Sequence, residues 1–194
     1  YWGLVQQTIQ GFGDKAFIVT KQGSLTYAEA NQRANVIYAA IQEMKSETGI
    51  GVGLFMKDPH QIIPAMMGVL KSRNYFIPLD VSFPEATLFS MFENAGIKAI
   101  LTVNQYADQI RALAGKNIPI INLDDLDFKR EIPDPVVNYS PNDIVQILFT
   151  SGSTGQPKGA IADYRYLSRS AFLKLSTFGH EPEERVLQFI RRPQ

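Results

Sequence analysis

Ten consecutive residues near the end of the chain combine the side-chain types that suit the binding of a polyphosphate. Residues 150–159 read Thr-Ser-Gly-Ser-Thr-Gly-Gln-Pro-Lys-Gly, with four hydroxyls, three glycines and one lysine. Glycines let backbone N–H groups approach an anion closely, hydroxyls donate to phosphate oxygens, and an ammonium group supplies compact positive charge. The segment therefore predicts a phosphate-binding loop. The competing interpretation is a flexible Ser/Gly surface turn, which has a similar composition.

Two common nucleotide motifs do not fit the sequence. A Walker loop has Lys followed by Ser or Thr after its second glycine, whereas Lys158 lies between Pro157 and Gly159. A Rossmann loop needs a third glycine after Gly51 and Gly53, and that glycine is missing. We interpret this glycine pair as a point of close packing or a local turn within a strand. An ordinary P-loop NTPase or a dinucleotide dehydrogenase is therefore poorly supported.

The loop directly follows an apolar run that predicts a strand at residues 144–149. Its apolar residues barely alternate with polar ones, so we expect both of its faces to be buried. Similar short runs predict strands at residues 50–56, 75–79, 97–103 and 118–121. Residues 124–141, rich in acids and proline, predict a surface connection.

Capping signals predict where the helices between these strands begin. Thr26 and Glu29 have the spacing of a capping box at the start of a long helix. Asp58 precedes a proline that suits the first turn of the next helix. Ser82, two residues before another proline, predicts a third start, and Asn104 a fourth.

Strands that alternate with capped helices predict an α/β fold, doubly wound, with a mainly parallel sheet flanked by helices. We expect residues 1–48 to form a helix and strand segment of a second lobe, and residues 49–194 to form the parallel α/β subdomain. In such sheets ligands bind beyond the carboxyl ends of the strands, where the loop at 150–159 is expected.

Composition narrows the classes of function. The 194 residues are 45% hydrophobic, enough to bury a sizeable core. Lys plus Arg and Asp plus Glu are 19 each, so no overall field favours nucleic acid or a lipid surface, and we expect neither partner. There is no cysteine, which excludes disulfides and fits a reducing compartment; cytoplasm is the default expectation. No apolar stretch approaches the roughly 20 residues of a membrane helix.

The loop, with its Pro157-Lys158-Gly159 ending, resembles the signature loop of the adenylate-forming (AMP-binding) superfamily. This superfamily includes acyl-CoA synthetases, luciferases and the adenylation domains of nonribosomal peptide synthetases. Residues 25–31 resemble its first core motif and residues 70–80 its second. The similarity runs from about residue 13 to residue 189. It implies an N-terminal fragment covering the first half of the large domain.

The resemblance implies a reaction in which a carboxylate attacks the α-phosphorus of ATP, giving an adenylate and pyrophosphate, before transfer to a thiol. The thiol would be CoA or the phosphopantetheine of a carrier protein. Mg²⁺ would bridge the phosphates. The catalytic lysine lies downstream in complete members, so this chain alone is expected to be inactive. No metal ligand is identifiable. The positions that would bind the phosphates are Thr150, Ser151, Gly152, Ser153, Thr154, Gly155, Lys158 and Gly159.

Alternatives stay open at this point. Pro78-Leu79-Asp80 and residues 185–189 favour amino-acid activation over an acyl-CoA synthetase. A non-catalytic nucleotide-binding or interaction module that keeps the fold is favoured by Tyr164, which stands where the family often has histidine. The family also often has glycine where Arg73 stands. A third possibility is a stand-alone phosphate-binding α/β protein. A downstream acidic ATP motif and a C-terminal lysine would favour the enzyme.

Overall fold

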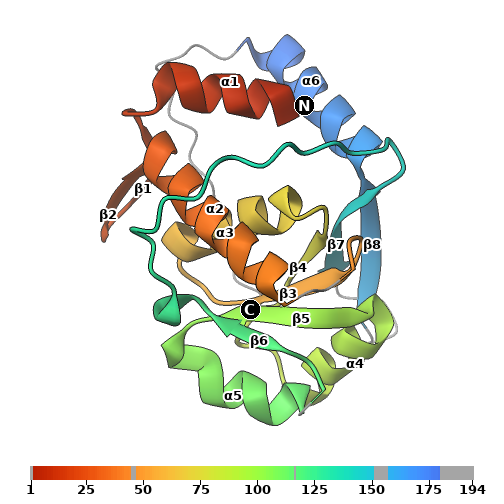
Figure 1. The fold of residues 1–194 in the computed structure, drawn as a ribbon. Coiled ribbons are helices and arrows are strands. Elements are labelled where there is room, and N and C mark those ends of the chain that lie inside the picture. Colours follow the sequence, from red (N-terminus) through yellow and green to blue (C-terminus); the bar gives the residue numbers. More distant parts are fainter. Residues whose placement is uncertain (1, 45–46, 116, 151–156, 180–194) are drawn as a thin grey trace.

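A six-stranded sheet forms the centre of the molecule (Figure 1) in the computed structural model, which describes residues 2–44, 47–115, 117–150 and 157–179. The strand order is β6-β5-β3-β4-β7-β8. All neighbours are parallel except the last pair, β7 with β8. The predicted mainly parallel α/β fold is confirmed. The strands are β3 (Gly51–Phe55), β4 (Tyr75–Pro78), β5 (Ile97–Thr102), β6 (Ile120–Asn122), β7 (Ile144–Thr150) and β8 (Lys158–Asp163).

Helices cover both faces of this sheet, as the sequence predicts. On one face, α2 (Tyr27–Glu43) and α3 (Pro59–Lys71) bury Ile37 and Val69 against Leu54 of the central strand. On the other face, α4 (Glu85–Ala95) and α5 (Asn104–Ala114) bury Leu88 and Ile110 in a second apolar cluster. The sheet is thus the middle of three layers, and its carboxyl edge stays available for loops.

The remaining elements lie around this core. Helix α1 (Trp2–Phe12) precedes an antiparallel pair, β1 (Ala16–Thr20) and β2 (Gly23–Thr26). A 3-10 turn, η1 (Leu123–Asp125), follows β6, and α6 (Tyr164–Phe178) follows β8. The division of the chain at residue 48 stays a prediction; α2 itself packs in the cluster that covers β3. None of the described helices is both long and apolar enough to cross a membrane.

Two predicted helix starts are confirmed by hydrogen bonds. Glu29 N donates to Thr26 Oγ1 at 3.1 Å, and Thr26 N donates to Glu29 Oε2 at 2.8 Å, which completes the capping box of α2. Asp58 Oδ1 accepts from His60 N at 3.0 Å, with a proline in the first turn of α3. Asn104 also begins α5 as expected. Local sequence is enough here because each partner lies within three residues.

The predicted start at Ser82 is wrong. The N-cap of α4 is Pro84, without a side-chain hydrogen bond. Ser82 instead donates from its N and Oγ to Asp80 Oδ1, at 2.8 and 2.6 Å. Asp80 and Phe83 close a turn around Ser82, and the first helical bonds of α4 go to Pro84 O, so Ser82 lies two residues before the N-cap position.

The expectation that residues 144–149 are buried on both faces is also wrong. In β7, Val145 and Ile147 are buried, but Leu148 is 42% exposed. β7 is next to the last strand of the described sheet, beyond the central strands that carry most of the two buried clusters. An apolar run therefore does not distinguish a central strand from a peripheral one.

The glycine pair in β3 is explained by close packing, as predicted. A Cβ on Gly51 would lie 2.9 Å from Ile77 Cδ1, and one on Gly53 would lie 2.8 Å from Leu79 Cδ1. Both distances are shorter than real Cβ contacts allow. The glycines let large side chains from the neighbouring strand lie across the central strand.

A long segment without helix or strand, residues 126–143, connects η1 to β7 and is called the crossover segment below. In Figure 1 it runs from the β6 edge of the sheet, past α2, to β7 on the other side. Most of its residues are exposed or half-buried, which confirms the predicted surface connection, although residues 124 and 125 belong to η1. The crossover segment leads directly into the strand that carries the candidate phosphate loop.

Candidate functional site

The candidate phosphate loop connects two paired strands. Thr150 is the last residue of β7 and Lys158 the first of β8, and the two residues are paired across the strands. Thr150 Oγ1 donates to Lys158 O at 3.4 Å. Both residues are exposed, and Lys158 makes no ion pair with another described residue. The Lys158 ammonium group is therefore available at the mouth of the loop, beside a hydroxyl whose proton is directed at the Lys158 carbonyl.

The inner part of the predicted site lies outside the described residues. This applies to Ser151, Gly152, Ser153, Thr154 and Gly155, whose assigned roles stay predictions.

Gly159, the last predicted site residue, lies within β8. A Cβ there would lie 3.0 Å from Ile147 Cγ2 and 3.5 Å from the Phe149 ring. Its lack of a side chain is thus explained by the fit between β7 and β8, and a role in phosphate binding stays a prediction.

The loop leaves the sheet at the edge where the other parallel strands end. Because β3, β4, β5 and β7 run in the same direction, their carboxyl ends meet at this edge. Polar residues follow these strands, but several are occupied by local bonds. Asp124, which follows the neighbouring parallel strand β6, is an example: its Oδ2 accepts from Asn104 N at 2.8 Å at the start of α5. Within the described ranges no three His, Cys, Asp or Glu side chains form a metal-binding group, so the predicted Mg²⁺ stays a prediction.

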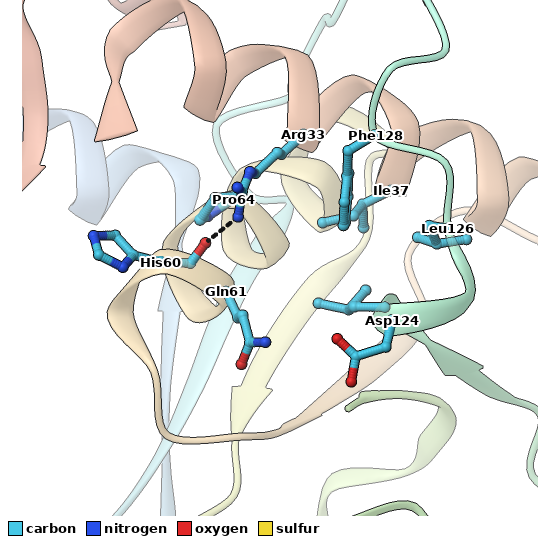
Figure 2. Close-up of a pocket in the computed structure, with 9 residues that line it drawn as sticks. Arg33, Ile37, His60, Gln61, Pro64, Asp124, Leu126 and Phe128 are labelled. Atoms are coloured by element: carbon cyan, nitrogen blue, oxygen red, sulfur yellow. Dashed lines mark hydrogen bonds between the residues drawn. The ribbon is translucent and has the colours of Figure 1, made fainter. Parts of the chain in front are cut away.

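A half-open cavity of about 240 Å³ lies beside the first turn of α3 (Figure 2). Arg33 of α2 donates from Nη1 to His60 O at 3.5 Å, and its guanidinium lies 5.4 Å from the centroid of the Phe128 ring. Gln61 and Asp124 line another side, and the imidazole of His60 points away from them. The volume is below the 300–1,000 Å³ that is typical of ligand pockets.

Sequence reasoning missed this cavity because its walls come from α2, α3, η1 and the crossover segment. Only the fold brings these segments together, and no local spacing predicts the combination. The lining combines polar side chains with buried apolar ones, among them Ile37 and Leu123. We assign no chemistry to the cavity.

A buried polar cluster was also missed. Lys71, at the end of α3, is 3% exposed, and its Nζ donates to Asn31 Oδ1 at 2.7 Å and to Asn35 Oδ1. It also forms an ion pair with Asp134 of the crossover segment, with Nζ 2.5 Å from Oδ1. The Trp2 ring centroid lies 5.8 Å from the same nitrogen. The cluster thus joins α1, α2, α3 and the crossover segment around one ammonium group.

Burial lowers the pKa of Lys71, although the hydrogen bond and charge of Asp134 act to raise it. Burial by itself would raise the pKa of Asp134, but the hydrogen bond and charge of Lys71 and the asparagine amides outweigh it and hold that pKa below its ordinary value. The two side chains therefore affect each other's pKa through one hydrogen-bonded contact. Asn31 and Lys71 lie in the two segments that resemble the first and second core motifs, so the two motifs meet in this cluster.

The family is decided by a match over nearly the whole chain. The sequence pattern of the family described as "AMP-binding enzyme" covers residues 5–191, including the candidate loop, both core-motif segments and the crossover segment. The chain belongs to the AMP-binding enzyme family. This family includes the adenylate-forming ligases, as the resemblance in the sequence implies.

Relatives of this AMP-binding chain include very long proteins. Nonribosomal peptide synthetase ecdA of Aspergillus rugulosus is 30% identical over 192 residues, which are 96% of this chain and 3% of that protein. Indigoidine synthase of Dickeya dadantii is 28% identical over 181 residues, which are 90% of this chain and 12% of that protein. Tyrocidine synthase 1 of Brevibacillus parabrevis is 24% identical, over 94% of this chain and 17% of its own length. The chain thus spans a small part of the curated relatives it matches.

Solved structures share the fold of this AMP-binding chain. VinN superposes with a TM-score of 0.83 at 20% identity, over 94% of this chain and 50% of that one. A fatty acyl-adenylate ligase from L. pneumophila, in complex with acyl adenylate and pyrophosphate, superposes with a TM-score of 0.79 at 21% identity, over 93% of this chain and 33% of that one. At such identities the likeness shows the fold alone.

Proposed function

We propose that this chain is part of an ATP-dependent ligase that activates a carboxylate as its adenylate and releases pyrophosphate. The observation that carries the proposal is the pairing of Thr150 with Lys158 at the carboxyl edge of the sheet, within the family match. In this proposal the Lys158 ammonium group binds the β- and γ-phosphates of ATP, and the Thr150 hydroxyl exchanges its long bond to Lys158 O for a bond to the same phosphates. A fixed cation and fixed donors at that place favour departure of pyrophosphate, because catalysis of phosphorus chemistry is mostly positioning and electrostatics.

An amino acid is the carboxylate that we propose for the complete enzyme. Support comes from Pro78-Leu79-Asp80 in the second core-motif segment and from the similarity to the nonribosomal peptide synthetase ecdA. The acceptor in this proposal is the phosphopantetheine thiol of a carrier protein. The alternatives are an acyl-CoA synthetase, in which CoA accepts the acyl group, and a non-catalytic nucleotide-binding module.

Binding of the ATP analogue AMPPNP in the presence of magnesium, measured by calorimetry, tests the phosphate site. We expect the chain to bind with roughly millimolar affinity, and Lys158→Ala to weaken that binding about tenfold, since it removes a charge-assisted contact. Lys98→Ala is the matched control: Lys98 is an exposed lysine near the start of β5, at the opposite edge of the sheet. Equal affinities for wild type, Lys158→Ala and Lys98→Ala would contradict the site.

Exchange of labelled pyrophosphate into ATP tests the reaction. We expect amino-acid-dependent exchange from a polypeptide that continues through the C-terminal lysine, and none from residues 1–194 alone. Exchange that depends on a fatty acid would favour the acyl-CoA synthetase alternative. AMPPNP binding without exchange in the longer polypeptide would favour the non-catalytic module.

A further inference from the structure

The hairpin of β7 and β8 joins the rest of the described sheet through β7, whose Ile147 packs in the apolar cluster on the α4 and α5 face. β7 pairs with β8 along its length, from Ile144 to Thr150. Its register with β4 is a single residue pair, Phe76 with Gln146. β8 is the last strand of the described sheet. Contacts at the base of the hairpin, far from the candidate loop, add to this packing in setting the orientation of the hairpin.

Backbone hydrogen bonds close this base. Tyr164 N donates to Asp143 O at 2.9 Å, and Arg165 N donates to Pro141 O at 3.0 Å. Nη2 of Arg165 also donates to Asn142 Oδ1 at 2.7 Å. These bonds join the end of the crossover segment to the start of α6. The chain that enters the hairpin and the chain that leaves it are thus held as one unit.

Two stacked tyrosines connect this unit to the helices. The rings of Tyr139 and Tyr164 have centroids 4.8 Å apart and planes 11° from parallel. Tyr139 OH donates to Leu70 O in the last turn of α3 at 2.6 Å. Tyr164 OH accepts at 3.1 Å from Trp2 N, a backbone group that the first turn of α1 leaves without a helical partner. The stack therefore has one bond to α3 and one to α1.

The chemistry of the stack suits a fixed connection. Burial raises the pKa of the Tyr139 hydroxyl, and the Asp143 charge adds to the effect, so this hydroxyl stays protonated and able to donate. An offset-stacked aromatic pair also stabilises the contact beyond the burial of its apolar surface. The two strands beyond the stack are stiff, because they are paired along their length.

We propose that Tyr139 and Tyr164 are positioning residues: their stack fixes the hairpin against α1 and α3, and so determines where Thr150 and Lys158 are presented to a nucleotide. This inference rests on the proposed function of those two residues. A seven-residue strand is roughly 20 Å long, so a tilt of about 5° at the stack moves its far end by about 2 Å. Misplacement by about 1 Å is enough to weaken a reaction strongly.

Two single-atom variants test the proposal. Tyr139→Phe removes the bond to Leu70 O, and Tyr164→Phe removes the bond to Trp2 N, while both keep the stacked rings. We expect each variant to weaken AMPPNP binding about three- to tenfold, and to speed amide hydrogen exchange at residues 159–162 of β8 relative to β5. The double variant should lose less affinity than the two single losses combined, because both bonds serve one connection.

Tyr75→Phe is the matched control. It removes a comparable bond, from Tyr75 OH to Ala95 O at 3.1 Å, in which neither stacked tyrosine nor the crossover segment takes part. We expect Tyr75→Phe to lose a similar amount of thermal stability. Its affinity for AMPPNP should change by less than about twofold, and amide hydrogen exchange in β8 should not change.

The outcomes separate this inference from the proposed function. If wild type binds AMPPNP and the Tyr139 and Tyr164 variants bind it equally well, the positioning role is overturned. If wild type binds no AMPPNP, the proposed function of Thr150 and Lys158 is overturned. Amide hydrogen exchange in β8 then still decides whether the tyrosine stack fixes the hairpin. Faster amide exchange in Tyr139→Phe than in wild type supports the positioning role, and unchanged amide exchange overturns it.

Discussion

Lys71 Nζ lies 2.7 Å from Asn31 Oδ1, so the end of α3 and the first half of α2 share one buried ammonium group. Asn31 Nδ2 in turn donates to Asp134 Oδ1 at 3.1 Å, and Lys71 forms an ion pair with the same carboxylate. The crossover segment is thereby attached to the helices about halfway along its length. Substitution of these residues therefore measures how much the attachment contributes to the free energy of unfolding.

Lys71→Met should destabilise the protein by about 2–4 kcal/mol, because it removes the shared donor and leaves the oxygens of Asn31 and Asn35 buried without it. The measurement is the free energy of unfolding in urea. Lys57→Met, at an exposed lysine after β3, is the control and should change stability by less than about 0.5 kcal/mol. Equal effects of the two substitutions would contradict an energetic role for the cluster.

The ion pair predicts a dependence of stability on pH. The pKa of Asp134 is lower in the folded protein than in the unfolded chain, where it is about 3.9. Its contribution is therefore fully present above the unfolded value and is lost as the pH falls through the folded value. The contribution should be about 0.5–1.5 kcal/mol, reduced because the side chain is 40% exposed.

Urea unfolding of wild type and Asp134→Asn from pH 7 down into the acid range measures this contribution. The stability difference between the two proteins should shrink as the pH falls, since protonation removes from wild type the charge that the variant already lacks. Parallel curves over the whole range would show that Asp134 titrates alike in both states.

Arg73 is the only described non-glycine residue with positive φ, at 58°. L-residues are disfavoured in this left-handed region, and glycine is not. Arg73 also lies 3.6 Å from Asp143, with its side chain 48% exposed. Arg73→Gly and Arg73→Ala both lose this ion pair. The difference in stability between the two variants therefore measures the cost of the left-handed backbone conformation for a residue with a Cβ.

We expect Arg73→Gly to be about 1 kcal/mol more stable than Arg73→Ala, the reverse of the order in an ordinary helix. Thermal unfolding of the two variants measures the difference. If the alanine variant is as stable as the glycine variant, the left-handed backbone at this position carries no strain.

Gly68 lies where α3 crosses α2 most closely. A Cβ there would lie 2.7 Å from Ile37 Cγ2 and 2.9 Å from Ala34 O, so Gly68→Ala requires the helices to separate. We expect a loss of about 1–3 kcal/mol despite the better helix propensity of alanine. Gly11→Ala in α1 is the control: it has no neighbour within 4 Å and should gain about 0.5–1 kcal/mol in unfolding measurements. A gain at both positions would contradict the close crossing.

The sequence alone predicted the alternation of strands and helices up to residue 149, the capping box at Thr26, the cap at Asp58 and the family, but not β8 and α6. These features depend on partners only a few residues apart or on motifs read directly from the chain. At Ser82 spacing was not enough, because this residue donates to Asp80 in a turn and the helix begins two residues later.

Only the tertiary structure decided which distant side chains meet. Lys71 and Asp134 are 63 residues apart, and Tyr139 and Tyr164 come together only because the crossover segment and α6 meet at the base of the hairpin. Likewise, the place of β7 near the edge of the sheet exposes Leu148. Burial and long-range hydrogen bonds depend on how the elements pack, and the pattern within one element carries no information about its neighbours in space.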